Sequence, residues 1–215
     1  MDPVGRASLV AVLDFEGVAA DEFNDWYDLE HIPERLSCPG FMSAERWIGG
    51  PACRTSLLVY HLGDLSALDS PEYRDISAES FSPWSRRIIG MCRKFDRYEG
   101  EQLESGAITG GEEGASALLF VAMNVDGAIE DDFNDWYREE HVPLLKGVPG
   151  VGSVRRYRAR AGPHKYFSIY HLDEPQVIET SAWRRASQTA WADRVRPGTR
   201  DHVRLLCHPY TGRKK

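Results

Sequence analysis

The sequence has few of the features that mark membrane, secreted or nucleic-acid-binding proteins. Its longest apolar runs, such as residues 115–122, have the length of a strand and are too short to cross a membrane. The N-terminal residues lack the basic start and long apolar stretch of a secretion signal, so we expect a cytoplasmic protein with no membrane partner. The formal net charge of -7 argues against a nucleic-acid partner, because affinity for phosphate backbones comes mainly from excess Lys and Arg.

Cysteine is also scarce, and several motifs of known chemistry are missing. The four cysteines have neither the density of a disulfide framework nor the spacing of a metal site, so we expect reduced thiols. The absence of a Gly-rich phosphate loop and of a Gly-x-Ser-x-Gly turn excludes the usual nucleotide sites and the nucleophile turn of α/β hydrolases. A metal site needs three or four converging ligands, and His31 with His61 and a carboxylate would supply them only by coincidence of folding. We therefore expect no metal and no other cofactor.

What is present is an ordinary globular composition and an internal repeat. Hydrophobic residues make up 42% of the 215 residues and charged residues 27%, which excludes a disordered chain. Residues 21–47 align without a gap on residues 131–157, at an offset of 110, and 13 of the 27 positions are identical. The identical residues of the first copy are Asp21, Phe23, Asn24, Asp25, Trp26, Tyr27, Glu30, His31, Pro33, Pro39, Gly40, Ser43 and Arg46. A period of this length indicates two copies of one domain.

Each copy has the same order of predicted elements. A short apolar run (7–13 or 115–123) predicts a strand, and a helix follows from about residue 21 or 131. Two runs rich in strand formers come next, then a second helical region from Pro71 or Pro175 and a last strand. This βαββαβ order predicts a ferredoxin-like domain. We expect a first domain over residues 1–102, a linker over 103–114 and a second domain over 115–215.

A ferredoxin-like sheet carries helices on one face only, so its other face needs a partner. Two tethered copies can cover each other's open faces. The sequence therefore predicts an α+β protein in which two ferredoxin-like domains pack sheet to sheet as a barrel within one chain, with a further homodimer left open.

The candidate site lies on the first helix of each copy. A projection at 100° per residue groups Phe23, Trp26 and Tyr27 on one side, with Glu30 in the middle of this stripe and His31 at its edge. The second copy has the equivalent residues Trp136, Tyr137, Glu140 and His141. Pro33, two residues after the histidine, predicts that the helix bends or ends there.

Two interpretations of this helix remain open. In the first, Glu30 or His31 is a general acid or base in a dry pocket, with Tyr27 as a proton partner, since a carboxylate on an apolar face must be paired or protonated. In the second, Glu30 binds loop amides near the Pro39–Gly40 turn and His31 caps the end of the helix. Trp26 and Trp136 are expected in the core or as a surface on which a ligand stacks.

Further candidates for ligand binding lie on the strands. His61 and His171 end an apolar strand face and are interpreted either as pocket residues or as buried structural imidazoles. Arg46 and Arg156 are candidates to pair with Glu30 or an anionic substrate, or are simply exposed. The first copy keeps more polar groups beside its histidine, since Glu34 and Arg35 become leucines in the second, so we expect the first pocket to be the specialised one.

The segments FNDWYDLEHIPERLSCPGFMSAERW and LLVYHLGDLSALDSPEYR resemble the EthD-like group of the dimeric α+β barrel superfamily. The resemblance covers both copies, most clearly residues 8–75 and 118–185, and weakens in the last strands. The superfamily includes cofactor-free monooxygenases, lactone isomerases, polyketide cyclases, decarboxylases and haem-degrading enzymes. Such proteins usually form the barrel from two chains, whereas this chain carries both domains.

The resemblance and the residues together favour a small-molecule-binding barrel. We expect a cofactor-independent enzyme that transfers a proton on a small apolar or aromatic compound, with Glu30/Glu140 or His31/His141 as the base and Tyr27/Tyr137 orienting the substrate. The alternatives are a non-catalytic ligand-binding or accessory protein, and a duplication whose shared residues only maintain the fold.

Overall fold

The computed structural model describes residues 6–50, 54–103 and 114–212 and divides into two compact units. Of the described residues, one unit holds 6–50, 54–101, 160–163 and 210–212. The other holds 102–103, 114–159 and 164–209. The predicted linker, residues 103–114, lies outside the described residues except at its two ends.

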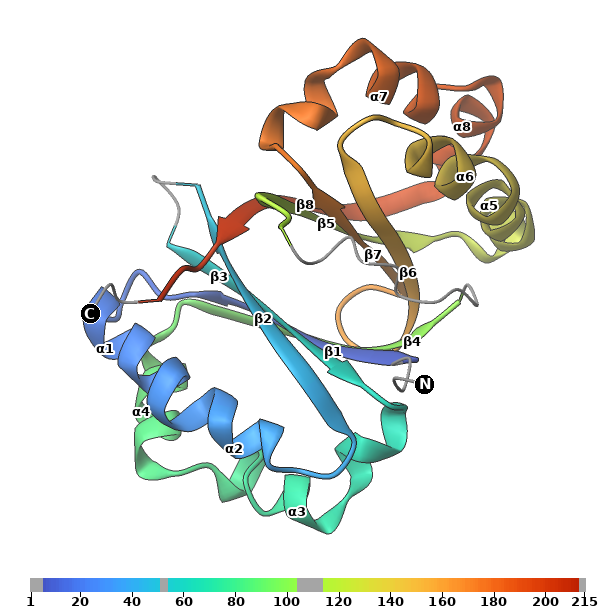
Figure 1. Cartoon of the computed structure of the whole chain (residues 1–215). Helices are drawn as coiled ribbons and strands as arrows, with labels where there is room; N and C mark the ends of the chain where they lie inside the picture. Colours follow the sequence, from blue (N-terminus) through green and yellow to red (C-terminus); the bar gives the residue numbers. More distant parts are fainter. Residues whose placement is uncertain (1–5, 51–53, 104–113, 213–215) are drawn as a thin grey trace. The chain divides into compact units, whose positions relative to one another are not determined.

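The first unit has the predicted βαββαβ plan, coloured blue to green in Figure 1. Its elements are β1 (Ala7–Asp14), α1 (Ala20–Trp26), α2 (Ile32–Leu36), β2 (Phe41–Gly49), β3 (Thr55–Leu62), α3 (Pro71–Arg74), α4 (Pro83–Met91) and β4 (Lys94–Gln102). Its strands are antiparallel and ordered β2–β3–β1–β4.

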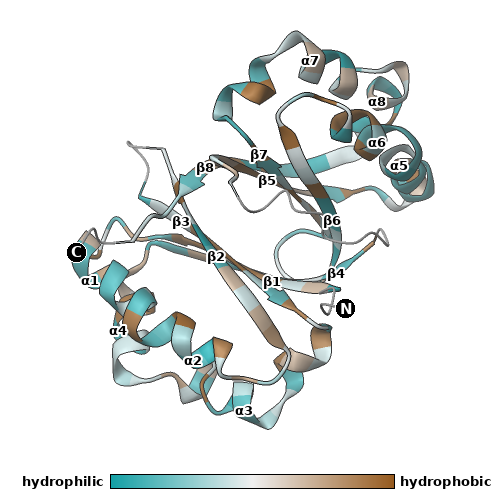
Figure 2. Ribbon diagram, in the orientation of Figure 1, coloured by the Kyte–Doolittle hydropathy of each residue, from teal (hydrophilic) through white to brown (hydrophobic). Residues whose placement is uncertain are grey.

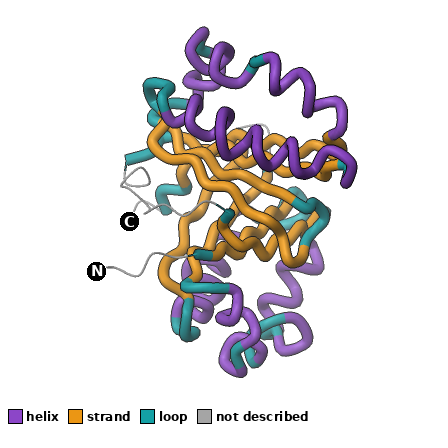
Figure 3. Tube along the Cα trace, turned by 90° about the vertical axis from the view of Figure 1, so that its right-hand side faces the viewer, coloured by secondary structure: helices purple, strands orange, loops and turns teal. Residues whose placement is uncertain are grey.

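The second unit repeats this plan. Its elements are β5 (Ala117–Val125), α5 (Glu130–Trp136), α6 (Val142–Lys146), β6 (Val151–Ala161), β7 (Tyr166–Leu172), α7 (Ser181–Ser187), α8 (Ala190–Val195) and β8 (Thr199–Pro209). The strand order is β6–β7–β5–β8, again antiparallel. In each unit the helices cover one face of the strands (Figure 3).

Each unit thus combines one antiparallel sheet with helices, which confirms the predicted α+β fold class. Over the described residues, no helix is long and apolar enough to cross a membrane.

The last strands depart from the offset of 110 that relates the two copies. Ala11 and Val121 are equivalent positions on β1 and β5, and their partners on the neighbouring strands are Arg97 and Arg204. The offset between β4 and β8 is therefore 204 − 97 = 107. This change of register explains why the repeat fades from the sequence in the last strands although the structure continues it.

Each unit has its own apolar core between sheet and helices. On β3, Leu58, Tyr60 and Leu62 belong to the core that faces the helices, as the alternation of strand residues predicts. Phe23 and Trp26 enter the same core from α1 and are completely buried. Figure 2 shows α1 and α5 hydrophilic over much of their outer surface. The sheet thus supports one wall of the site, and α1 with the following turn supports the other.

The helix that begins as α1 does not end at the histidine. A π-helical turn over Tyr27–His31 follows α1, and α2 then continues the helix to Leu36. The second unit has the same π-helical turn over Tyr137–His141. Pro33 was predicted to bend or end the helix, and the prediction that the helix ends there is wrong, because α2 continues to Leu36. Proline has no backbone N–H, so no regular helical hydrogen bond is broken at Pro33. The π-helical turn lies just before it.

Candidate functional site

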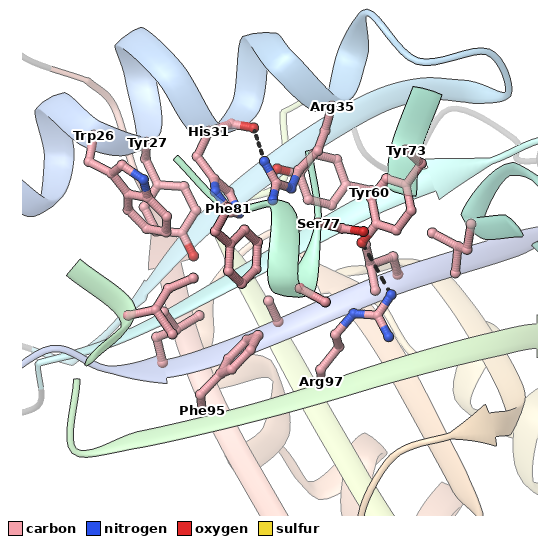
Figure 4. Close-up of a pocket in the computed structure, with 16 residues that line it drawn as sticks. Trp26, Tyr27, His31, Arg35, Tyr60, Tyr73, Ser77, Phe81, Phe95 and Arg97 are labelled. Atoms are coloured by element: carbon pink, nitrogen blue, oxygen red, sulfur yellow. Dashed lines mark hydrogen bonds between the residues drawn. The ribbon is translucent and has the colours of Figure 1, made fainter. Parts of the chain in front are cut away.

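A cavity of about 300 Å³ opens between the sheet and the helices of the first unit (Figure 4). Most of its wall is apolar or aromatic. The polar and aromatic lining residues are Trp26, Tyr27, His31, Arg35, Tyr60, Tyr73, Ser77, Phe81, Phe95 and Arg97. No Asp or Glu is among the described residues that line it.

The π-helical turn brings the shared tryptophan and histidine to one side of the helix. In such a turn a backbone N–H bonds the carbonyl five residues back, and here the N–H of Ile32 bonds the Tyr27 carbonyl. Trp26 and His31, which are five residues apart, therefore stack with ring centroids 4.2 Å apart. In a regular α-helix they would lie about 140° apart around the axis. The histidine predicted at the edge of the aromatic stripe thus lies within it.

His31 is a buried, neutral imidazole. Its side chain is 8% exposed, and Nδ1 has no hydrogen-bond partner among the described residues. Burial, with the nearby Arg35 cation, holds the pKa of His31 well below its usual range. The predicted role of His31 as a helix cap is not what the contacts show. Its side chain lines the cavity.

Arg35 is a cavity residue that the sequence interpretation did not select. It is 3% exposed, and its guanidinium donates to the backbone carbonyls of His31 (3.1 Å) and Ile76 (3.3 Å). Figure 4 shows it beside His31 at the cavity wall. Since it follows His31 by four residues, the helical spacing alone could have placed it on the same face. It supplies a fixed positive charge to the cavity.

Tyr60 was also not proposed as a site residue. Its hydroxyl has no hydrogen-bond partner within the described part of the chain, and its side chain lines the cavity. Burial raises the pKa of Tyr60 well above its usual range, so the phenol stays protonated and can donate. The pKa of Tyr27 is raised in the same way.

Glu30 points away from the cavity. Its Oε1 accepts hydrogen bonds from the hydroxyls of Ser82 (2.6 Å) and Ser85 (3.1 Å) at the start of α4. The indole of Trp26 in turn donates to Ser85 Oγ at 2.9 Å. The proposed contact of Glu30 with amides near the Pro39–Gly40 turn is therefore wrong, because the side chain joins the first helix to α4.

Glu140 repeats this arrangement in the second unit. It accepts hydrogen bonds from the Trp136 indole (3.1 Å) and from the hydroxyl of Thr189, which caps α8. The carboxylate that the repeat preserves thus ties two helices together in both copies.

The shared asparagine and arginine form a second structural pair. Arg46 donates to Asn24 Oδ1 at 2.5 Å and lies 3.4 Å from Asp28, and its guanidinium stacks 4.5 Å from the Tyr27 ring centroid. Arg46 is buried, so the prediction that its side chain is exposed is wrong. The predicted pairing of Arg46 with Glu30 is also wrong.

Arg156 makes the equivalent contacts in the second unit. It donates to Asn134 at 2.6 Å and stacks 4.2 Å from the Tyr137 ring. Neither arginine lines the cavity of its unit.

His61 and His171 lie on the opposite face of their strands from Tyr60 and Tyr170. The Nε2 of His61 is 2.7 Å from Glu45 Oε1, and the Nδ1 of His171 is 2.8 Å from Ser153 Oγ. Both are buried and neither lines either cavity. Their contacts are those of structural imidazoles.

The second unit has its own cavity, of about 410 Å³. It keeps the equivalents Trp136, Tyr137, His141 and Tyr170. Its remaining polar lining residues are Arg184, Ser187, Gln188, Arg196, Thr199, His202 and Arg204. The second cavity therefore carries more arginines than the first.

His141 resembles His31 in its surroundings. Its Nδ1 has no hydrogen-bond partner in the described residues, and its ring centroid lies 4.3 Å from that of Trp136. Burial and the cations Arg196 and Arg156 lower its pKa to about 3. Within the same residues, no group of three or more His, Cys, Asp or Glu side chains could hold a metal ion.

One family model matches part of the chain. Residues 126–194 match the EthD domain, which confirms the resemblance for the second copy. No curated protein matches the sequence.

Solved structures similar to the whole chain show the same fold at low identity. An anthrone oxidase-like protein aligns with a TM-score of 0.69 at 14% identity, over 96% of this chain and 92% of its own. A candidate monooxygenase from Lactobacillus acidophilus aligns with a TM-score of 0.58 at 9% identity, over 94% and 92%. A chlorite dismutase from Candidatus Nitrospira defluvii aligns with a TM-score of 0.62 at 9% identity, over 96% and 91%. At these identities the likenesses show a shared fold.

Proposed function

We propose that the chain is a small-molecule-binding barrel protein and that the cavity of the first unit binds a small, largely aromatic compound, from which His31 removes a proton. The observation that carries this proposal is the free Nδ1 of a buried, neutral imidazole that faces an aromatic cavity of about 300 Å³. The name of one similar structure, an anthrone oxidase-like protein, supports a compound of this kind.

The surroundings of His31 restrict the proton that it can take. An imidazole with a lowered pKa is a weak base, so the substrate must be acidic, such as a phenol or a carbon acid next to a carbonyl group. Proton transfer to Nδ1 leaves a negative charge on the substrate oxygen. The buried guanidinium of Arg35 and the protonated hydroxyl of Tyr60 are placed to stabilise that charge.

One feature of the cavity favours a second function. Glu30 accepts hydrogen bonds from Ser82 and Ser85, and no carboxylate lines the cavity within the described residues. His31 therefore has no acidic partner to complete a proton relay. The alternative is a protein that holds the same kind of compound without turnover.

Anthrone is a suitable probe because base catalysis at its methylene carbon exchanges hydrogen for deuterium. We expect the protein in D₂O to accelerate this exchange, measured by NMR, and His31→Asn to lower the enzymatic rate about 100-fold, since a positioned base contributes about 10²–10⁴-fold. His141→Asn is the matched control, because it changes the equivalent residue of the other cavity. Thermal melting of both variants checks that they are folded.

The two functions give different results in this experiment. Exchange no faster than in buffer, together with anthrone-dependent quenching of tryptophan fluorescence that His31→Asn weakens, would establish the binding protein. If anthrone and other aromatic ketones or phenols neither bind nor exchange, both proposals for the first cavity are wrong.

A further inference from the structure

We propose that the cavity of the second unit is a recognition site for an aromatic carboxylate, held by Arg184 and Arg204. This site is separate from the proposed proton transfer in the first cavity and does not depend on it. The proposal rests on a comparison of the same wall positions in the two copies.

Arg97 of the first cavity is already occupied by protein groups. It pairs with Glu99 on its own strand and donates to the hydroxyl of Tyr73 at 3.2 Å, as Figure 4 shows for Tyr73. Its guanidinium therefore already has a carboxylate and a phenol oxygen as partners. Arg204 holds the equivalent position in the second unit, because the two arginines lie opposite equivalent residues of β1 and β5.

Both partners of Arg97 are replaced in the second copy. Leu206 lies opposite Leu119 as Glu99 lies opposite Leu9, and Trp183 stands 110 residues after Tyr73. Neither a leucine nor an indole can accept a hydrogen bond from a guanidinium in the way that a carboxylate or phenol oxygen can. Among the described residues, Arg204 accordingly has no ion-pair partner within 4.0 Å.

Other cations lie around the same cavity. Arg184 comes from α7 and has no ion-pair partner in the described residues either. Arg196 donates to the backbone carbonyl of Ser187 and is thereby held at the wall. His202 hydrogen-bonds Thr199 Oγ1 at 2.9 Å. No Asp or Glu is among the described lining residues, so the field of these cations is not cancelled inside the cavity.

A buried polar atom also points to a missing ligand. His141 is 7% exposed and lines the cavity, yet its Nδ1 has no hydrogen-bond partner among the described residues. As a neutral imidazole it can donate from, or accept at, that nitrogen. Such an orphaned group is expensive in a folded protein unless a ligand or water satisfies it.

The remaining wall indicates the body of the ligand. Trp136, Tyr137, Trp183 and Phe133 provide aromatic surface beside the cations. Guanidinium groups bind carboxylates through paired N–H donors, and aromatic rings stack on planar apolar groups. A flat aromatic ring system that carries one carboxylate matches both features.

Titration of the full chain with 2-naphthoate and with the neutral 2-naphthamide tests the proposal, by calorimetry at low and moderate salt. We expect naphthoate to bind at least tenfold more tightly than the amide, with an affinity that falls as salt rises. Arg204→Gln and Arg184→Gln should each weaken naphthoate about tenfold or more. The matched control is Arg185→Gln, which removes a neighbouring exposed charge of α7 that does not line the cavity and should change affinity less than twofold.

Three results would overturn the proposal. One is equal binding of naphthoate and naphthamide. Another is unchanged naphthoate affinity in folded Arg204→Gln and Arg184→Gln variants, with melting temperatures near that of the parent. The third is tight binding of inorganic phosphate with none of naphthoate, which would assign the cations to a phosphate group instead.

Discussion

At the scale of single residues, several identities shared by the two copies hold the first helix in place beside the cavity. Asn24 accepts a hydrogen bond from Arg46, and Glu30 joins the first helix to α4. His31 differs from these because its side chain lines the cavity and its Nδ1 has no hydrogen-bond partner among the described residues. Sequence identity between the copies therefore does not distinguish structural residues from the candidate base. The contacts of each side chain do.

The asparagine–arginine pair can be tested in the second unit. Asn134→Ala removes the acceptor, 2.6 Å away, of the Arg156 guanidinium, which is 2% exposed. A hydrogen bond to a buried charged group is worth about 1.5–3 kcal/mol, so we expect the free energy of unfolding to fall by about 2 kcal/mol. Urea unfolding at pH 7 measures this. A fall below about 0.5 kcal/mol would show that water replaces the amide.

Burial of His141 predicts that the free energy of unfolding depends on pH. Its pKa is about 3 in the folded chain and about 6.5 when unfolded, so below pH 6.5 the unfolded chain binds more protons. The stabilisation is complete above pH 6.5 and is lost as the pH falls toward 3. Between pH 7 and pH 5, His141 should lower the free energy of unfolding by about 2 kcal/mol.

Urea unfolding of the parent and of His141→Asn at both pH values isolates this contribution. The variant should lose about 2 kcal/mol less than the parent on acidification. Equal losses in the two proteins would mean that His141 is protonated or solvated in the folded chain.

At the scale of elements, the strands and the order of helices follow from the apolar runs and their periods, but the π-helical turn does not. A projection at a constant 100° per residue assumes bonds four residues apart and places Trp26 and His31 on different sides. The wider turn depends on backbone hydrogen bonds such as that from the Ile32 N–H to the Tyr27 carbonyl, which leave no pattern in side-chain hydropathy. The change of offset in the last strands likewise leaves no pattern in hydropathy. The equivalence of Arg97 and Arg204 could therefore not be predicted from the sequence.

The turn from α2 into β2 has a position that only glycine fits. Gly40 has φ +86°, and a Cβ there would lie 2.6 Å from the Cβ of Ala67. Gly40→Ala should lower the free energy of unfolding by about 1–3 kcal/mol, through backbone strain and the clash.

Gly90→Ala is the matched control for this substitution. Gly90 lies in α4, with no atom within 4 Å of an added Cβ, so alanine there should stabilise the protein by roughly 0.5 kcal/mol. Thermal or urea unfolding compares the two. Similar effects of both substitutions would contradict the strained turn.

At the scale of the whole molecule, the duplication supplies two cavities with different chemistry. The fold and the repeat could be predicted because thirteen identities and the element order survive in the sequence. The difference between the cavities could not, because it comes from residues that converge from β8, α7 and the turn after α8.

The two cavities have no lining residue in common. We therefore expect anthrone and 2-naphthoate to bind together, one of each per chain, in native mass spectrometry. His31→Asn should weaken anthrone alone, and Arg204→Gln should weaken naphthoate alone. Displacement of one compound by the other at equal concentrations would show that they share a site.

The π-helical turn also provides a sequence criterion. The turn aligns a tryptophan with a histidine five residues later, and a proline follows the histidine by two residues in both copies. The pattern Trp, four residues, His, one residue, Pro can therefore be sought in other barrel sequences. Where this pattern occurs on the first helix, the histidine is expected to line the cavity, even when a helical wheel places it at the edge of the aromatic stripe.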